Sequence, residues 1–311
     1  MKINPVYRRE TTVSTRSFRM ALIILVFNSL LAVVALLNMY SVVSKVKVTA
    51  EIQYSSFLEL YTFVATMEFG MLMFIIPALT AGSISGERER GTLELMLTTK
   101  MTPVQIVIGK LAASFSTIFL LIISSFPVLS LVFVYGGVTF SDICMLLLCY
   151  LVTAYLAGSV GICFSSIFKR STIATAVSYG FLAALVAGSY AINVFALSIG
   201  RMNVDSYAQN IGSVAQQTSS GGILYLLLLN PAANFYITIQ QQVGNYQKTN
   251  HITQWFGARE ANLITENWNL CSIVVQILVA TIFLVIAIRR VDPRKNKLGM
   301  DLGDMESNKQ F

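Results

Sequence analysis

Apolar residues run through the chain in long stretches, and each stretch is long enough to cross a bilayer as a helix. About 20 apolar residues span the hydrocarbon core of a membrane. Stretches of this length predict six membrane-spanning helices, over residues 18–43, 60–84, 104–135, 142–168, 172–199 and 270–289. We find no internal repeat in the sequence, so we expect residues 1–311 to form a single all-α membrane domain.

A further apolar stretch, residues 221–239, is interrupted in its middle by Asn230-Pro231. Proline lacks an amide hydrogen and disfavours helix at the preceding residue. If this stretch crossed the membrane, the basic C-terminal tail would also move to the opposite side from the other basic segments. We therefore expect a re-entrant or external helical hairpin within the region 200–268, before the last span.

The basic residues are divided unequally between the two sides of a six-span arrangement. One side receives 17 of the 22 Lys and Arg residues, and the other receives Lys45, Lys47, Arg201, Lys248 and Arg259. Because basic loops stay in the cytoplasm, both termini are predicted to be cytoplasmic. Composition agrees with a membrane protein, since only 12% of residues are charged and 55% are hydrophobic. No basic stripe on a soluble domain is visible, so we expect no nucleic acid partner.

The N-terminal segment and the cysteines give less information about fold and function than the apolar stretches do. Residues 4–19 hold Pro5 and four arginines, which is compatible with an interfacial helix or with a solvated tail. The four cysteines lie in or beside apolar stretches, without a CxxC or Cys/His cluster. Neither a metal site nor a disulfide framework is predicted, although a Cys144–Cys271 pair stays open.

The connection "SGERERGTLELMLTTKMTPVQIVIGK", residues 85–110, gathers seven charged residues between two apolar spans. Gly91 is suited to end one helix, and Thr92 to cap a second, short one. On that short helix Leu93, Met96 and Leu97 share one face. A helix of this length is not stable alone, so the face needs a partner. A groove on a soluble protein and the membrane surface are both compatible with the pattern.

The same connection ends in a helix-start signature. Thr102 is placed to be the N-cap, Pro103 the first helical residue and Gln105 the third. This order predicts a capping box at the start of the third span.

The stretch "GERERGTLELMLTT" followed by "MTPVQIVIGKLAA" resembles the signature of ABC-2 type transporter permeases. The usual pattern of that family is a Gly-Glu-Arg-Glu-x-Gly-Thr-Leu-Glu-x-Leu-Leu run, then a proline-containing start to the third span. The resemblance implies a permease subunit that pairs with a second copy, or a close relative, and with two ABC ATPase subunits. It also implies that the cytoplasmic helix at about 86–99 is a coupling helix. The implied contact residues are Gly86, Glu87, Arg88, Glu89, Arg90, Gly91, Thr92, Leu93, Glu94, Met96 and Leu97.

ATP chemistry is expected on another chain. No GxxxxGK[ST] loop is present, and the Gly109-Lys110 pair lacks both the upstream glycine and the following Ser or Thr. We therefore expect this chain to bind no cofactor, with ATP and Mg on the partner ATPase. An intramembrane enzyme would need a nucleophile–base pair or metal ligands at membrane depth, and Glu68 alone does not supply one.

Glu68 is the only acidic residue well inside a predicted span. An intramembrane carboxylate is costly and is a functional-site candidate, but a hydrogen-bonded Glu packed between helices fits equally. Asn38 and Asn193 offer amides for interhelical hydrogen bonds or for a substrate path. The resemblance implies that spans one, two and five border the path, which favours Glu68 and Asn38.

Gly180, Ala184 and Gly188 recur every four residues in the fifth span. Small residues at this spacing permit close helix contacts. We predict that they form the contact between two permease copies, with packing inside one subunit as the alternative.

The function that these features favour is export across a bacterial cytoplasmic membrane, driven by separate ATPase subunits. No large external domain is predicted, so the expected cargo is amphipathic or lipophilic, with small amphipathic, antimicrobial or toxin peptides favoured. Export of lipophilic drugs, of glycolipid or polysaccharide, and a non-transporting scaffold regulated by an ATPase remain alternatives.

Overall fold

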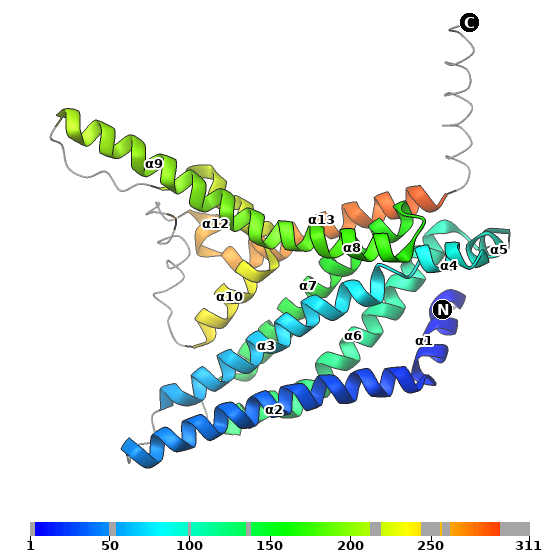
Figure 1. Ribbon diagram of the computed structural model, residues 1–311, viewed down its shortest axis with the longest axis horizontal. Coiled ribbons are helices and arrows are strands. Elements are labelled where there is room, and N and C mark those ends of the chain that lie inside the picture. The colour runs from blue at the N-terminus through cyan, green and yellow to red at the C-terminus, as the bar shows by residue number, and fades with distance from the viewer. Residues whose placement is uncertain are drawn as a thin grey trace, which may run out of the picture.

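The computed structural model of the 311-residue chain describes residues 4–49, 54–98, 101–134, 138–211, 219–243, 256 and 262–292. Every regular element in these ranges is helical (Figure 1). Within the described residues, six helices or helix runs are long and apolar enough to cross a membrane. They are Phe18–Ser41, Leu58–Glu89, Pro103–Leu129, Phe140–Ile167, Ser171–Met202 and Trp268–Val291. The six spans predicted from apolar length are thus confirmed, with shifts at their ends.

Helix α7 (Phe140–Ile167) is the centre of the bundle, and α3 (Tyr54–Thr80), α6 (Pro103–Val134) and α13 (Trp268–Val291) pack around it. Small residues on α7 allow this approach. The backbone of Gly161 lies so close to Thr80 of α3 that no side chain would fit between them. α2 (Phe18–Thr49) runs along the outside of α3 and α6 (Figure 1) and leaves much of its apolar surface exposed.

The fifth span is interrupted by one π-helical turn. α8 (Ser171–Ala183) passes into η1 (Ala184–Gly188) and then into α9 (Ser189–Ile211) without leaving the helical path. A π-helical turn inserts an extra residue into the helix and often marks a functional position.

The broken apolar stretch forms two helices, η2 (Gly221–Leu229) and α10 (Pro231–Gln242), which meet at an angle of 91°. Asn230 makes the bend. Its side chain accepts hydrogen bonds from the amides of Ala232 and Ala233, and so caps α10 in front of Pro231. The break predicted at Asn230-Pro231 is confirmed. The position of this hairpin relative to a membrane stays a prediction.

The first helix, α1 (Pro5–Thr15), lies against α6 near the start of that span (Figure 1). A Cβ atom added at Gly109 of α6 would lie 2.8 Å from the Cβ of Val6, so the close approach of the two helices depends on the absence of a side chain at Gly109. Residues 5–15 are therefore helical, and their place at a membrane interface stays a prediction. All four cysteines are free thiols, which removes the Cys144–Cys271 pair.

Candidate functional site

The connection between the second and third spans forms two short helices, α4 (Ser85–Glu89) and α5 (Thr92–Thr98). Gly91 separates them with a φ of +68°, a left-handed conformation that glycine adopts without strain. The predicted helix break at Gly91 is confirmed. Thr92 does not act as the expected cap, because it is the first residue of α5 and its hydroxyl donates to the backbone oxygen of Glu87, 3.1 Å away, and to the Glu87 carboxylate.

The capping box of α6 follows the sequence prediction. The amide of Thr102 donates to the Gln105 side-chain oxygen at 3.1 Å, and the amide of Gln105 donates to the Thr102 hydroxyl at 3.3 Å. Helix α6 begins at Pro103 between them.

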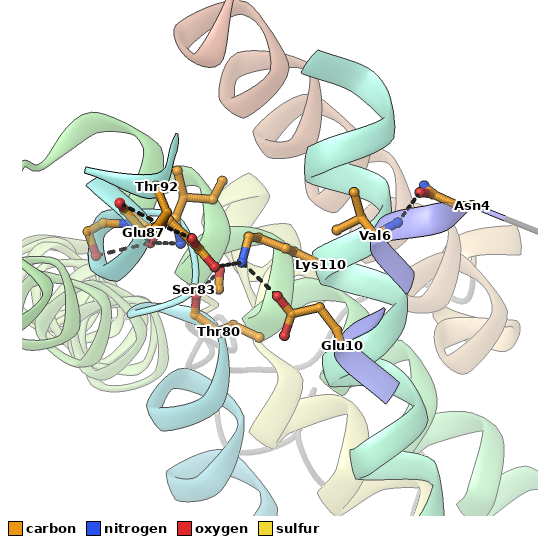
Figure 2. A network of polar contacts seen from close by, with 11 residues as sticks. Asn4, Val6, Glu10, Thr80, Ser83, Glu87, Thr92 and Lys110 are labelled. Atoms are coloured by element: carbon orange, nitrogen blue, oxygen red, sulfur yellow. Dashed lines mark hydrogen bonds and ion pairs between the residues drawn. The ribbon is translucent and has the colours of Figure 1, made fainter. Parts of the chain in front are cut away.

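An ion triad ties α4 to two other helices. The ammonium group of Lys110, on α6, lies 3.2 Å from the Glu87 carboxylate of α4 and 3.1 Å from the Glu10 carboxylate of α1. Figure 2 shows Lys110 between these two acidic side chains. The lysine side chain is only 4% exposed, so its charge is largely held by the two carboxylates rather than by water. We call Glu10, Glu87 and Lys110 the ion triad.

The remaining face of α4 is joined to the corner between α7 and α8. The hydroxyl of Ser165 accepts hydrogen bonds from the amides of Ile84 and Ser85, both at 2.9 Å. Arg88 donates to the carbonyl of Ser166 at 3.0 Å, and Glu89 accepts from the amide of Ser171 at 2.9 Å. The Glu-Arg-Glu run therefore makes its polar contacts with this chain.

The apolar face of α5 also turns inward. Leu93 is 5% exposed and Met96 is 8% exposed, and both pack in a cluster with Val6 of α1 and Ile106 of α6. Leu97 is half-buried against the same cluster. The hypothesis that this face is offered to a partner needs correction, because tertiary packing already covers it. The exposed surface of the segment consists of Glu89, Arg90, Gly91, Glu94, Leu95 and Thr98, and Leu95 is 67% exposed.

Of the candidates for a substrate path, Glu68 and Asn193 are fully buried within the subunit. Ser125 of α6 donates a hydrogen bond to the Glu68 carboxylate, and the amide of Asn193 donates to the Ser189 carbonyl at 2.9 Å. The contact with Ser125 joins α3 to α6 and favours the packing interpretation of Glu68, whose second carboxylate oxygen has no hydrogen-bond partner among the described residues. The bond of Asn193 stays within α9, so the role of Asn193 stays a prediction. Asn38 lies half-buried on α2.

The predicted dimer stripe lies on an open face. Gly180 and Ala184 are exposed, and Gly188 is half-buried. No atom lies within 4 Å of a Cβ added at Gly180 or at Gly188, beyond neighbours in the chain and its own helix. The stripe therefore does not pack against another helix within the described part of the subunit.

An apolar cavity of about 300 Å³ adjoins the π-helical turn. Val186, Tyr190, Leu227, Asn230 and Tyr236 are among its lining residues, from η1, α9, η2 and α10. Asn230 joins the two sides, because its amide donates to the Val186 carbonyl at 3.0 Å and to the Ser189 hydroxyl at 2.8 Å.

Sequence reasoning did not single out several of these residues. Lys110 carried a weak signal, a lysine seven residues into an otherwise apolar helix, but its partner Glu10 lies 100 residues away. Leu95 was missed because helical periodicity places it opposite the apolar face of α5. Within the described ranges, no group of three or more His, Cys, Asp or Glu side chains is arranged to hold a metal ion.

Comparison with protein-family models gives one match, the ABC-2 family transporter protein model, over residues 26–289. That range covers most of the chain and all six candidate spans in whole or in large part. The chain belongs to the ABC-2 transporter family. It is thus a multi-pass membrane protein and a transporter subunit of an ABC system, from a family of transmembrane subunits that are generally non-catalytic and typically pair with ABC ATPases. A search of the curated proteins finds no match to this ABC-2 protein.

Proposed function

We propose that this ABC-2 protein is the permease subunit of a bacterial ABC exporter, and that α4 and α5 receive the ATPase. The proposal rests on two properties of this segment, namely its attachment to several spans and its exposed surface. The ion triad and Ser165 attach it to α1, α6 and α7, while Leu95 stays 67% exposed. A segment attached to several spans is suited to pass a movement of the ATPase to the helix bundle.

The rest of the assembly follows from charge and family. The 17 basic residues on one side support a cytoplasmic location of the termini, α4 and α5, on the side where the proposed ATPase subunits bind ATP and Mg. Two ATPases serve two permease copies, which meet through the exposed stripe of Gly180, Ala184 and Gly188.

The cargo is amphipathic or lipophilic. The apolar cavity of about 300 Å³ beside η1 supports this class, because it falls at the lower end of the sizes of small-molecule sites, about 300–1,000 Å³. It has room for a small lipophilic molecule or for the apolar side chains of a small peptide. A polysaccharide chain fits neither its size nor its lining.

A substitution at Leu95 tests the ATPase contact. We expect Leu95→Asp to lower cargo-stimulated ATP hydrolysis by the co-purified ABC ATPase at least about tenfold, while the unfolding temperature of the permease stays unchanged, since an exposed side chain contributes little to packing. Leu263→Asp is the matched control, because Leu263 is 79% exposed on α12 (Leu263–Glu266), outside this segment. If Leu95→Asp kept full cargo-stimulated ATP hydrolysis, α5 would not be part of the ATPase contact.

Filling the apolar cavity tests the cargo. Ala233→Trp places a bulky side chain in the cavity lining. We expect this variant to lose ATP-driven uptake of a lipophilic dye and of an amphipathic peptide into inside-out vesicles, with ATPase binding retained. Unchanged uptake of both compounds would contradict the assignment of this cavity.

A further inference from the structure

A second cavity, of about 550 Å³, lies where α1, the first turn of α2, the end of α3, α4 and α6 come together. Five of its lining residues are charged, namely Glu10, Arg19, Glu87, Arg90 and Lys110. It includes the ion triad but extends beyond it (Figure 2 shows the triad). We call it the polar cavity.

The polar cavity has an excess of positive charge. Lys110 is held by Glu10 and Glu87, at 3.1 and 3.2 Å, so the ion triad has a net charge of about −1. Arg19 and Arg90 are both exposed residues of the lining. Together the five charges sum to about +1, which matches a ligand with a single negative charge.

The lining becomes less polar with depth. Ala78 and Leu79 of α3, and Ala113 and Thr117 of α6, line the part that is farther along the spans than Lys110. Lys110 and Thr117 are seven residues apart on one helix, which corresponds to about 10 Å at 1.5 Å per residue. A cavity that is charged at the end of the spans and partly apolar along them is suited to an amphiphile that lies at the membrane boundary.

We propose that the polar cavity binds the headgroup of an anionic phospholipid, with Arg19 and Arg90 contacting its phosphate and the adjoining acyl chain lying along α3 and α6. Arginine is suited to phosphate because its planar guanidinium donates paired hydrogen bonds. The bound lipid would connect α2, through Arg19, to the junction where the ion triad joins α1, α4 and α6. The proposal rests on the six membrane-spanning helices and not on export or on ATPase coupling.

Lipid binding to the purified full chain tests the proposal. We would remove bound lipid in detergent and then titrate phosphatidylglycerol, phosphatidylcholine or inorganic phosphate, with native mass spectrometry as the readout. We expect phosphatidylglycerol to bind more tightly than phosphatidylcholine, whose headgroup has no net charge. Arg19→Gln combined with Arg90→Gln should weaken the binding of phosphatidylglycerol about tenfold or more, the scale expected when charge-assisted hydrogen bonds are lost.

Two variants separate the cavity from general surface charge. Arg16→Gln combined with Arg170→Gln removes two exposed arginines that do not line the cavity, and should leave binding unchanged. Ala113→Phe fills the cavity without changing any charge, and should abolish binding while the chain still unfolds cooperatively. The same loss in the Arg16/Arg170 control, or full binding in Ala113→Phe, would overturn the proposal. Displacement of the lipid by inorganic phosphate at equal concentration would also overturn it, because the site would then be one for free phosphate.

Discussion

The ammonium group of Lys110 lies 3.2 Å from the carboxylate of Glu87, and the lysine side chain is only 4% exposed. This pair joins the third span to the short helix that leaves the second span, and Glu10 extends it to the first helix. One buried cation therefore holds its own helix to two segments whose acidic residues lie 23 and 100 residues away in the chain.

Removal of Lys110 should destabilise this junction. We expect Lys110→Met to lower the free energy of unfolding by about 1–3 kcal/mol, because Glu10 and Glu87 lose their shared cation. Both carboxylates are partly exposed to water, so the loss is smaller than for a fully buried ion pair. Equilibrium unfolding in mixed micelles measures it. The triple variant with Glu10→Gln and Glu87→Gln should recover part of the loss. Lys169→Met, at an exposed site, is the control, and an equal effect there would contradict a specific role of the triad.

The contact between α1 and α6 depends on Gly109. We expect Gly109→Ala to lower the free energy of unfolding by about 1–3 kcal/mol, because the added Cβ would lie 2.8 Å from the Cβ of Val6 and would force the helices apart. Displacement of α1 should also speed trypsin cleavage after Arg8 and Arg9. Gly70→Ala is the control, since nothing lies within 4 Å of its added Cβ. Unchanged cleavage in Gly109→Ala would show that α1 does not depend on this contact.

Glu68 should have a structural role. Glu68→Gln keeps an oxygen that accepts from Ser125, so we expect transport to be unchanged and stability to change by less than about 1 kcal/mol. Glu68→Ala removes both the acceptor and buried volume, and should cost about 2–3 kcal/mol. Transport assays and unfolding measurements on both variants check this. Loss of transport in a stably folded Glu68→Gln protein would restore Glu68 to the substrate path.

Asn230 has two roles that substitutions separate. Asn230→Asp keeps the oxygen that caps α10 but removes the donor to the Val186 carbonyl and the Ser189 hydroxyl. Asn230→Ala removes both the capping oxygen and the donor, and should lower the free energy of unfolding by about 1–3 kcal/mol. We expect lipophilic dye binding beside η1 to weaken in both variants, and α10 to be less stable only in Asn230→Ala, as measured by amide hydrogen exchange. If Asn230→Asp bound the dye as the wild type does, the hydrogen bonds from Asn230 to Val186 and Ser189 would not be needed to form the binding cavity.

Local patterns were sufficient for the long spans, for the short helices after the second span and for the break before the last span. The six spans follow from apolar length, the start of α6 from Thr102, Pro103 and Gln105, and the break in the apolar hairpin from Asn230-Pro231. Each of these signals acts within a few residues of the chain, so periodicity and backbone chemistry reveal it. The ABC-2 resemblance rested on the same kind of signal, a contiguous motif in one connection.

The sequence by itself thus determined the membrane spans, the two short helices between the second and third spans, and the family. Tertiary structure decided which faces of those helices are covered. It buried Leu93 and Met96, left Leu95 exposed, enclosed Glu68 and brought Glu10 to Lys110. The physical reason is that an amphipathic pattern shows only that one face of a helix needs a partner. Whether that partner is lipid, another protein or a distant helix depends on contacts between residues far apart in the chain.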